Sequence, residues 1–374
     1  MKVRAAVLSR MGLPPPYADS RPLTLAEVDL DPPGPGELLV RIRAAGLCHS
    51  DLSVIDGSRP RAMPMVLGHE AAAEIVECGG DTPGFAPGDQ VVLAFVPSCG
   101  HCAYCAEGRA ALCTPGAAAN TAGTLLSGQR RWHGADGALN HHLGVSAFAE
   151  YAVVSARSAV RVDADLPPRI AALFGCAVMT GVGSVINTAR VAPGHSVAIF
   201  GMGGVGLAAL LGAVASGAHP IVAVDRLPAK LELARSLGAT YTVLADDTAV
   251  EQVRDHTAGG ADYAIETAGS AQALQQAYAA TSRGGTTVTA GLPHPDRSFS
   301  VPAVSLVAEE RTVKGSYMGS AVPTRDLPRY VAMYRAGKLP VEKLLTHTLR
   351  LDDINIAFDR LAAGAAVRQI VTFE

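Results

Sequence analysis

Residues 196–217, SVAIFGMGGVGLAALLGAVASG, constrain the fold of this chain more than any other segment. An apolar run leads directly into a cluster of glycines, and a second apolar run follows; the glycines are Gly201, Gly203, Gly204 and Gly206. In this context the first glycine permits a tight turn, the second lets the backbone come close to a ligand, and the last lets the following helix pack on the strand. The segment therefore predicts a strand, a turn and a helix whose N-terminus faces an anion.

Strand-like and helix-like segments alternate around this motif. We expect strands over 196–201, 220–225, 262–269 and 286–293 and helices over 205–218, 229–239 and 273–285. Alternation at this spacing is typical of a parallel, doubly wound sheet. The tail predicts two helices, 326–340 and 351–364, and a strand over 368–374. Because the tail has no domain pattern of its own, we expect it to return to the N-terminal part of the chain.

The first 160 residues have a different character. Short β-like runs such as VRAAVL, ELLVRIRAAG and AAAEIVECGG are separated by Pro- and Gly-rich turns, and no long segment has a helical period. We therefore expect an all-β, barrel-like region. Residues 114–146 show no clear periodicity and are interpreted as a long surface excursion.

An acid ends the strand that follows the glycine motif. Asp225 lies nineteen residues after Gly206, where a carboxylate can accept hydrogen bonds from the adenosine ribose hydroxyls of a dinucleotide and repel a 2′-phosphate. NAD is therefore favoured over NADP. Arg226 favours NADP instead, because an arginine at this turn can pair with a 2′-phosphate.

Four of the seven cysteines lie within fifteen residues, at Cys99, Cys102, Cys105 and Cys113. Four thiolates on one loop suit a closed, tetrahedral zinc site, which is structural because it leaves no open position. A ferredoxin-like cluster loop begins with the same spacing but continues Cys-x3-Cys-Pro, so the longer last gap favours zinc.

A second metal site requires residues that are scattered along the chain. Cys48, His69 and Cys176 supply two thiolates and one imidazole, which neutralise a zinc ion and leave one position open. From spacing alone, Cys48 and Cys176 are equally well explained as small core residues. Cys78, which belongs to no motif, is expected to pack in its strand.

These motifs together resemble the zinc-dependent medium-chain alcohol dehydrogenase family. The matching pieces are CHSD at 48–51, GHE at 68–70, the four-cysteine run, FGC at 174–176, GMGGVG at 201–206 and the terminal VRQIVTF. The resemblance covers essentially the whole chain. It implies a GroES-like β-rich catalytic domain, 1–178 with 319–374, and an inserted Rossmann domain, 179–318.

The resemblance also implies roles for individual residues. Cys48, His69 and Cys176 would ligate the catalytic zinc, with Asp51 orienting His69, Glu70 as the acid beside the metal, and Ser50 contacting the substrate oxygen and starting a proton relay. The expected cofactor contacts, besides the glycines and Asp225, are His49 and Arg368 at the pyrophosphate, Thr180 and Val205 behind the nicotinamide, and Lys230 near the ribose. The expected substrate pocket is Ser50, Phe95, His142, Leu143 and Leu292.

Some of these positions have plainer interpretations. Phe95 could be ordinary core, His141 and His142 could belong to an exposed loop, and Trp132, with its two neighbouring arginines, could be surface rather than the rim of an entrance. Ser53 stands where several family members end the proton relay in a histidine, so we expect proton exit through water or His49 and an altered pH dependence.

The resemblance and the residues together predict an NAD- and zinc-dependent dehydrogenase for a primary aliphatic, allylic or aromatic alcohol, with two zinc ions per chain. The alternatives are a thiol-dependent formaldehyde dehydrogenase, for which the expected arginine after Cys113 is missing, and a non-catalytic zinc-stabilised NAD-binding protein. Polyol oxidation is less favoured because the pocket is apolar. The long 114–146 excursion resembles that of dimeric members of the family and is shortened in many tetrameric ones, so the resemblance also implies a homodimer.

Composition excludes several other classes. A net charge of -3 gives no attraction to nucleic acid or an anionic membrane, and with 17% charged and 49% hydrophobic residues the chain is not disordered. No apolar run reaches membrane-spanning length and no secretion signal is evident, so we expect a cytoplasmic protein.

Overall fold

The structure is a computed structural model that describes residues 1–373. The chain divides into two compact units, of which the first comprises Met1–Cys176, Val322–Pro328 and residues 345–373 and the second comprises Ala177–Ala321 and Arg329–Leu344. The sequence-based boundaries differ mainly in Arg329–Leu344, which they place in the first domain. Its place in the second unit has a visible cause, because Tyr330 accepts a hydrogen bond from Asn187 and Leu339, Val341 and Leu344 are buried.

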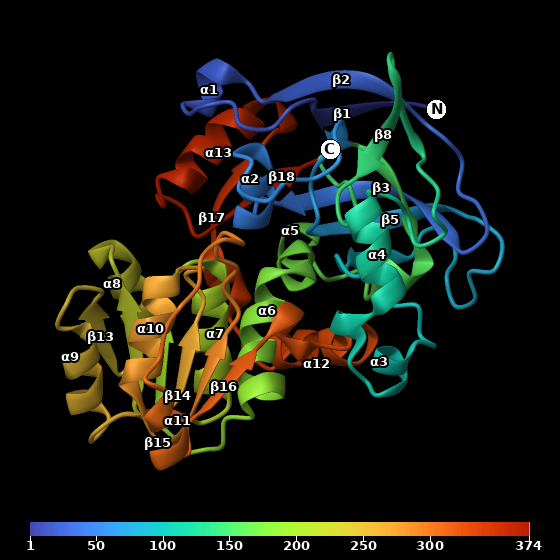
Figure 1. The fold of residues 1–374 in the computed structure, drawn as a ribbon. Helices are drawn as coiled ribbons and strands as arrows, with labels where there is room; N and C mark the ends of the chain where they lie inside the picture. The colour runs from blue at the N-terminus through green and yellow to red at the C-terminus, as the bar shows by residue number, and fades with distance from the viewer. Residues whose placement is uncertain (374) are drawn as a thin grey trace. The chain divides into compact units, whose positions relative to one another are not determined.

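The second unit is built on one parallel sheet with the order β13-β12-β11-β14-β15-β16. Helices cover both faces of this sheet, as expected for a doubly wound fold (Figure 1). The strands are β11 (Val197–Phe200), β12 (Ile221–Asp225), β13 (Tyr241–Leu244), β14 (Ala261–Glu266), β15 (Thr281–Thr289) and β16 (Thr312–Gly315). The helices are α6 (Ala177–Gly183), α7 (Gly204–Ala215), α8 (Pro228–Ser236), α9 (Ala249–His256), α10 (Ala271–Ala280) and α11 (Ala303–Ala308), and α12 (Pro323–Arg335) crosses the division between the units.

One predicted helix is too long. The helix expected over 273–285 ends at Ala280, and β15 begins at Thr281. The Thr281 hydroxyl donates to the carbonyl of Ala277 and so closes the last turn. Gly284 then takes a left-handed backbone conformation, with φ of 72°, which a continuing helix does not allow.

The first unit contains two sheets. One is a closed barrel of order β1-β2-β7-β8-β4, and the other is a seven-stranded sheet of order β10-β6-β5-β3-β18-β17 in which β9 also pairs with β3. The strands are β1 (Lys2–Leu8), β2 (Leu23–Leu30), β3 (Glu37–Gly46), β4 (Met65–Val66), β5 (Ala71–Cys78), β6 (Gln90–Leu93), β7 (Trp132–Gly134), β8 (Gly137–His141), β9 (Tyr151–Ser155), β10 (Ala159–Val162), β17 (Leu345–Leu349) and β18 (Arg368–Thr372). Their buried apolar residues form one core cluster.

The β-rich unit also carries helices, which the expectation of an all-β region missed. Within the first 160 residues they are α1 (Tyr17–Ser20), α2 (His49–Ile55), α3 (Ala103–Ala106) and α4 (Thr114–Ala122); α5 (Pro168–Ala171) follows, and α13 (Ile354–Ala362) confirms the helix expected over 351–364. All but two have seven or fewer residues, too few for a helical period to show in the sequence. The return of the tail is confirmed, since β18 pairs antiparallel with β3; β17, which pairs with β18, was not predicted.

The interpretation of 114–146 as a surface excursion is wrong. The segment holds α4, β7 and β8, and the two strands close the barrel. Trp132, His141 and His142 are all buried, at 0%, 0% and 1% exposure, so neither an exposed loop nor a surface tryptophan is observed. Alternation over three to five residues was too short to be recognised as strand in a Gly- and Ala-rich segment.

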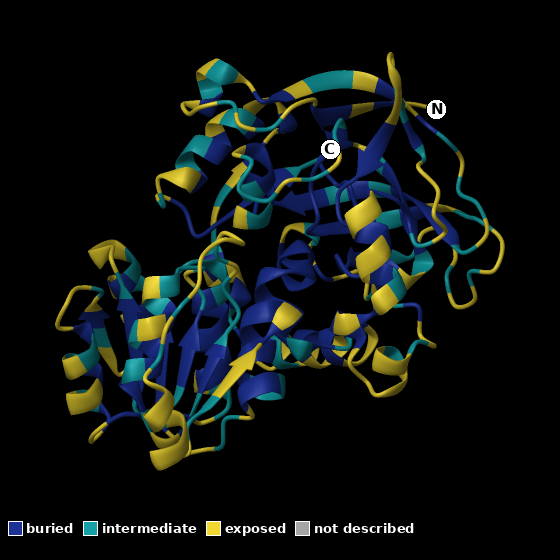
Figure 2. Ribbon diagram, in the orientation of Figure 1, coloured by how far each residue is buried: buried dark blue, intermediate teal, exposed yellow. Residues whose placement is uncertain are grey.

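Among the described residues, no single helix is long and apolar enough to cross a bilayer, although Pro168–Gly175 and Ala177–Ala189 together meet the length and composition criterion. In both units the central strands are buried and dark blue, whereas outer helices, loops and edge strands such as β16 carry exposed positions (Figure 2).

Candidate metal centres and dinucleotide site

Three buried donors from distant parts of the chain meet in the first unit. Cys48 lies at the N-terminal cap of α2, His69 follows β4, and Cys176 follows the short helical turn Ala172–Gly175. Their donor atoms all lie within 4.8 Å of one another, and their exposures are 7%, 1% and 5%. The structure thus brings together the three predicted ligands of the second zinc site.

The loop that carries His69 depends on a glycine. Gly68 has a φ of 94°, and a Cβ there would lie 2.6 Å from the backbone nitrogen of Phe148. Any other residue would therefore strain the backbone and collide with it, displacing His69.

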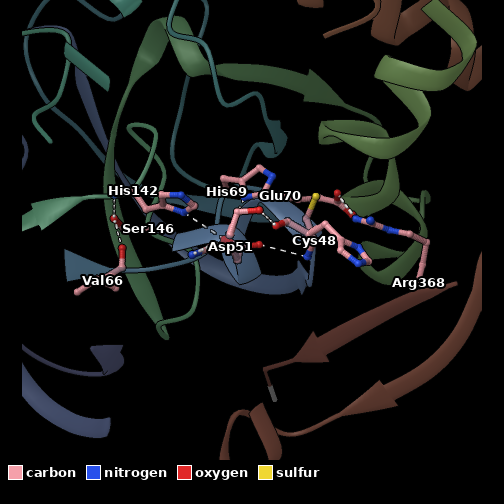
Figure 3. A network of polar contacts seen from close by, with 11 residues as sticks. Cys48, Asp51, Val66, His69, Glu70, His142, Ser146 and Arg368 are labelled. Atoms are coloured by element: carbon pink, nitrogen blue, oxygen red, sulfur yellow. Dashed lines mark hydrogen bonds and ion pairs between the residues drawn. The ribbon is translucent and has the colours of Figure 1, made fainter. Parts of the chain in front are cut away.

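Asp51 holds the imidazole of His69 from behind. Its Oδ1 lies 3.0 Å from His69 Nδ1 and its Oδ2 accepts from the backbone nitrogen of Cys48 at 3.2 Å (Figure 3). With Nδ1 directed at the carboxylate, Nε2 is the nitrogen left for a metal. Burial would raise the pKa of Asp51, but the neighbouring histidines more than offset this and hold it well below its ordinary value.

The two thiols carry opposite shifts. A hydrogen bond from Cys176 outweighs the cost of burial and, with His69, lowers the pKa of Cys48 well below its ordinary value. The same contact and burial raise the pKa of Cys176 well above it. Burial would lower the pKa of His69, but Asp51 and Cys48 raise it. Two thiolates and one imidazole are a donor set that suits zinc. Ionising the second thiol is costly without a metal, and a bound divalent cation would stabilise that thiolate.

Glu70 and Arg368 form a buried ion pair beside these donors (Figure 3). Burial raises the pKa of Glu70 although Arg368 opposes the shift. Burial would lower the pKa of Arg368, but Glu70 and the two thiols raise it. Arg368, which we expected at a pyrophosphate, is 4% exposed and directed at Glu70. Gly46 makes room for the acid, because a Cβ there would collide with the Glu70 carboxylate.

The four-cysteine loop converges on a second point. The sulfurs of Cys99, Cys102, Cys105 and Cys113 all lie within 4.8 Å of one another. Backbone N–H groups donate to these sulfurs, among them that of Cys102 to Cys99 Sγ at 3.3 Å and those of Cys99 and Gly116 to Cys113 Sγ at 3.2 and 3.4 Å. Such bonds stabilise thiolates and fit a tetrahedral zinc site.

The pKa values in this loop show why it needs a cation. Backbone N–H groups of Cys105 and Thr114 lower the pKa of Cys102 to about 6, whereas burial and its thiol neighbours raise that of Cys105 to about 12. One thiol therefore ionises readily and the next does not. A bound divalent ion is what would let all four serve as thiolates.

In the second unit the glycine turn has the expected form. Gly201 has a φ of 97°, and a Cβ on Gly206 would collide with the carbonyl of Gly201, so only glycine allows α7 to start this close to β11. The Asp225 carboxylate lies beside the turn, accepting from Met202 N at 2.6 Å and from Leu227 N at 2.9 Å. This arrangement presents backbone N–H groups and a carboxylate at the carboxyl end of a parallel sheet, where dinucleotides bind.

The other residues predicted for the cofactor and substrate sites are distributed over both units and differ in exposure. In the first unit, Ser50 is half-buried, His49 is exposed, Leu143 is buried, and the buried Phe95 ring meets His69 edge-on at 5.5 Å. In the second unit, Thr180 is buried, Val205 and Lys230 are half-buried, and Leu292 is 46% exposed. Ser53 donates its hydroxyl to the carbonyl of His49, within its own helix.

Sequence reasoning missed one residue in each unit. Ser146 anchors the backbone of His142, which no sequence signal indicates. Glu266, 1% exposed at the end of β14, accepts from Gly269 N at 2.6 Å and from the Thr289 hydroxyl at 2.7 Å. It therefore joins the loops that follow β14 and β15; its place at a strand end, like that of Asp225, was the available signal.

Comparisons with known proteins define the family. Residues 34–164 match the family model described as "Alcohol dehydrogenase GroES-like domain". Residues 204–335 match the model described as "Zinc-binding dehydrogenase". The class-3 alcohol dehydrogenase of Myxine glutinosa is 37% identical over 94% of each chain. The S-(hydroxymethyl)glutathione dehydrogenase of Synechocystis is 35% identical over the whole of both chains. The crystal structure of benzyl alcohol dehydrogenase from Acinetobacter calcoaceticus superposes with a TM-score of 0.92, at 31% identity and full coverage of both chains.

Identity at this level over whole chains shows common descent and a common fold. The chain belongs to the zinc-dependent medium-chain alcohol dehydrogenase family. It is an oxidoreductase of the alcohol dehydrogenase type, with a GroES-like unit and a Rossmann-like sheet. Zinc and a nicotinamide dinucleotide are its cofactors.

Proposed function

We propose that this protein is an NAD-dependent zinc alcohol dehydrogenase that interconverts a primary alcohol with an aliphatic, allylic or aromatic tail and its aldehyde. The observation that carries the proposal is the convergence of Cys48, His69 and Cys176, three donors with an acid behind the histidine. A closed structural site would need a fourth protein ligand, as the four-cysteine loop has, whereas three ligands leave a position for substrate.

The residues of the first unit would act on the alcohol. Bound zinc would supply the Lewis acidity that lowers an alcohol's pKa, and bound NAD would accept the hydride. Cys48, Cys176 and His69 would hold the metal, and Asp51 would fix the ring of His69. Ser50 would hydrogen-bond the substrate oxygen and receive its proton.

The onward path of that proton would differ from relay-histidine relatives. Ser53 lies four residues after His49 in the same helix, and its hydroxyl donates a hydrogen bond to the carbonyl of His49 at 2.8 Å. We propose that His49, which is exposed, or water receives the proton. A Ser53→His variant would test this, with a changed pH–rate profile as the expected result and an unchanged profile as the result against it.

The cofactor preference rests on Asp225. Its carboxylate is held beside the glycine turn by two backbone N–H groups, where it would accept from ribose hydroxyls and repel a 2′-phosphate. The proposed cofactor contacts besides Asp225 and the glycines are His49, Thr180, Val205, Lys230 and Arg368. The proposed substrate pocket consists of Ser50, Phe95, His142, Leu143 and Leu292.

We further propose a cytoplasmic homodimer. Val304 and Val307 of α11 are 72% and 81% exposed, and β16 is an edge strand with an exposed Val313. Exposed valines on α11 and on an open sheet edge suit pairing with a second copy, and both elements carry exposed positions, yellow in Figure 2. Thiol-rich metal sites and free cysteines fit a reducing compartment.

The competing function is oxidation of a thiol adduct of formaldehyde, favoured by the relative named for S-(hydroxymethyl)glutathione. The segment after the structural cysteines reads GAAAN, without the arginine expected to bind the glutathione carboxylate. We therefore rank this activity second.

The test is NADH formation from short aliphatic, allylic and benzylic alcohols and from S-(hydroxymethyl)glutathione, with NAD and then NADP, in protein shown to hold two zinc ions per chain. Turnover of a primary alcohol with NAD, abolished by Cys48→Ser and retained in Cys78→Ser, supports the proposal. Cys78 is the matched control because it is half-buried at the end of β5 and outside both thiol clusters. Turnover of the adduct alone would support the competing function, and silence with every substrate would support the non-catalytic alternative.

A further inference from the structure

Two histidines share one carboxylate oxygen in the first unit. His142 Nδ1 lies 3.1 Å from Asp51 Oδ1, the same atom that lies 3.0 Å from His69 Nδ1 (Figure 3). The two rings meet edge-on, with centroids 5.4 Å apart and an interplanar angle of 89°. His142 is 1% exposed, so its ring is enclosed by protein.

The position of His142 is set independently of Asp51 and His69. Its backbone N–H donates to Ser146 Oγ at 2.9 Å, and the Ser146 hydroxyl donates to the carbonyl of Val66 at 2.8 Å. Val66 also pairs with His141 in the parallel ladder of β4 and β8. The backbone that carries the imidazole is therefore anchored beside β4 and β8, and its Nδ1 faces the carboxylate of another element, α2.

His142 Nδ1 lies close to Asp51 without an aligned hydrogen bond, and this contact adds to backbone contacts of Asp51 that are themselves long. The backbone nitrogens of Gly68 and Cys48 lie 3.3 and 3.2 Å from its oxygens, which is long for a bond to a carboxylate. Without His142, Asp51 Oδ1 would keep only His69 and one long backbone contact, beside a space the size of an imidazole. The carboxylate could then rotate and take the His69 ring with it.

We infer that His142 is a positioning residue: by holding Asp51, it fixes the orientation of His69 and strengthens metal binding at the Cys48–His69–Cys176 site. The inference rests on the proposed function, since it needs those three donors to bind zinc. It gives His142 a role in addition to the one proposed for it in the substrate pocket: its ring is 1% exposed and its Nδ1 faces Asp51. Partners that orient a metal-ligating histidine are typically worth 10–100-fold in metal affinity.

The experiment compares His142→Phe, which fills the space without a donor, with His142→Asn, whose amide nitrogen can replace Nδ1. Zinc dissociation constants are measured by competition with a chromophoric chelator, and the absorption bands of cobalt bound in the same site report ligand geometry. We expect about 10–100-fold weaker binding at this site and shifted cobalt bands in His142→Phe. His142→Asn should lie near the wild type, and the four-cysteine site should be unchanged in both variants.

Several outcomes would overturn the inference. One is equal zinc affinity in wild type and His142→Phe; another is equal loss in both variants, which would indicate packing alone. A third metal equivalent that disappears in His142→Phe would make His142 a ligand instead. If His142→Phe does not fold, Ser146→Ala loosens the same ring through its backbone and should weaken zinc binding in the same direction; unchanged affinity would again contradict us. A wild-type chain that binds one zinc only would overturn the proposed function itself.

Discussion

Arg368 and Glu70 are 298 residues apart in the sequence and form an ion pair buried from solvent, with 4% and 0% of their side chains exposed. A buried ion pair contributes little net stability, but removing one partner leaves the other charge buried without compensation. We predict that Arg368→Ala lowers the free energy of unfolding by about 3–5 kcal/mol, measured by denaturant titration in excess zinc. Adding Glu70→Gln to this variant should recover part of the loss. A cost below about 1 kcal/mol would mean that water reaches Glu70.

The four-cysteine loop should behave as a structural metal site. Cys113 is fully buried, so Cys113→Ser removes a ligand and leaves its hydrogen-bond donors, Cys99 and Gly116, without a sulfur. We expect loss of one zinc equivalent and a fall in Tm of roughly 6–12 °C, as a loss of about 3 kcal/mol would give in a unit of this size. Cys78→Ser is the control and should keep two zinc ions. Full metal content in Cys113→Ser would contradict the assignment.

Asp225 should decide the dinucleotide preference. Asp225→Asn retains an acceptor but removes the charge, and we expect NAD to bind roughly 10-fold more weakly while the ratio of NADP to NAD affinity rises. Calorimetric titration of both dinucleotides measures this. Arg226→Ala should leave NAD affinity near the wild type. The assignment fails if the wild type prefers NADP or if Asp225→Asn binds NAD unchanged.

Buried His141 should make the protein sensitive to acid. Burial, with Arg130 and Arg131, lowers the pKa of His141 from 6.5 to about 3. The unfolded chain therefore takes up a proton between pH 6.5 and pH 3 that the folded chain refuses, so stability falls as the pH falls through this window. At pH 5 the cost is about 2 kcal/mol relative to pH 7.

The matched variant is His141→Gln, which can still accept from the backbone of Arg131, the bond that His141 Nε2 makes at 3.1 Å. Unfolding of both proteins is followed at pH 7 and pH 5 in excess zinc. The variant should lose about 2 kcal/mol less than the wild type over this interval. Parallel losses in the two proteins would show that His141 is protonated in the folded state.

The exposed apolar surface of the second unit should mediate dimerisation. Val307→Glu places a charge on the most exposed valine of α11, and we expect a monomer in sedimentation velocity where the wild type is a dimer. Val76→Glu is the control, because Val76 is 42% exposed in the first unit and outside this surface. A dimer that survives Val307→Glu, or a wild-type tetramer, would place the interface elsewhere.

Local patterns predicted the parallel character of the second sheet better than they predicted the barrel. Four of its six strands, β11, β12, β14 and β15, were expected from alternating elements of four to twelve residues, whereas the edge strands β13 and β16 were not. In the first unit, β4 has two residues, β7 has three and α2 has seven. Such elements exist because their neighbours pair with them, as β4 does with both β1 and β8. Their periodicity is too short to be visible in advance.

The sequence alone determined which donors exist and where the chain can turn. Closely spaced features such as the four cysteines and the glycine turn depend on local geometry, and the structure brings their atoms together as the spacing predicts. Only the tertiary structure decided what the long-range partners do: it directed Arg368 at Glu70 and turned His142 to Asp51. The physical reason is that burial removes water as an alternative partner, so each polar group pairs with whatever the fold places beside it, and that neighbour comes from a distant part of the chain.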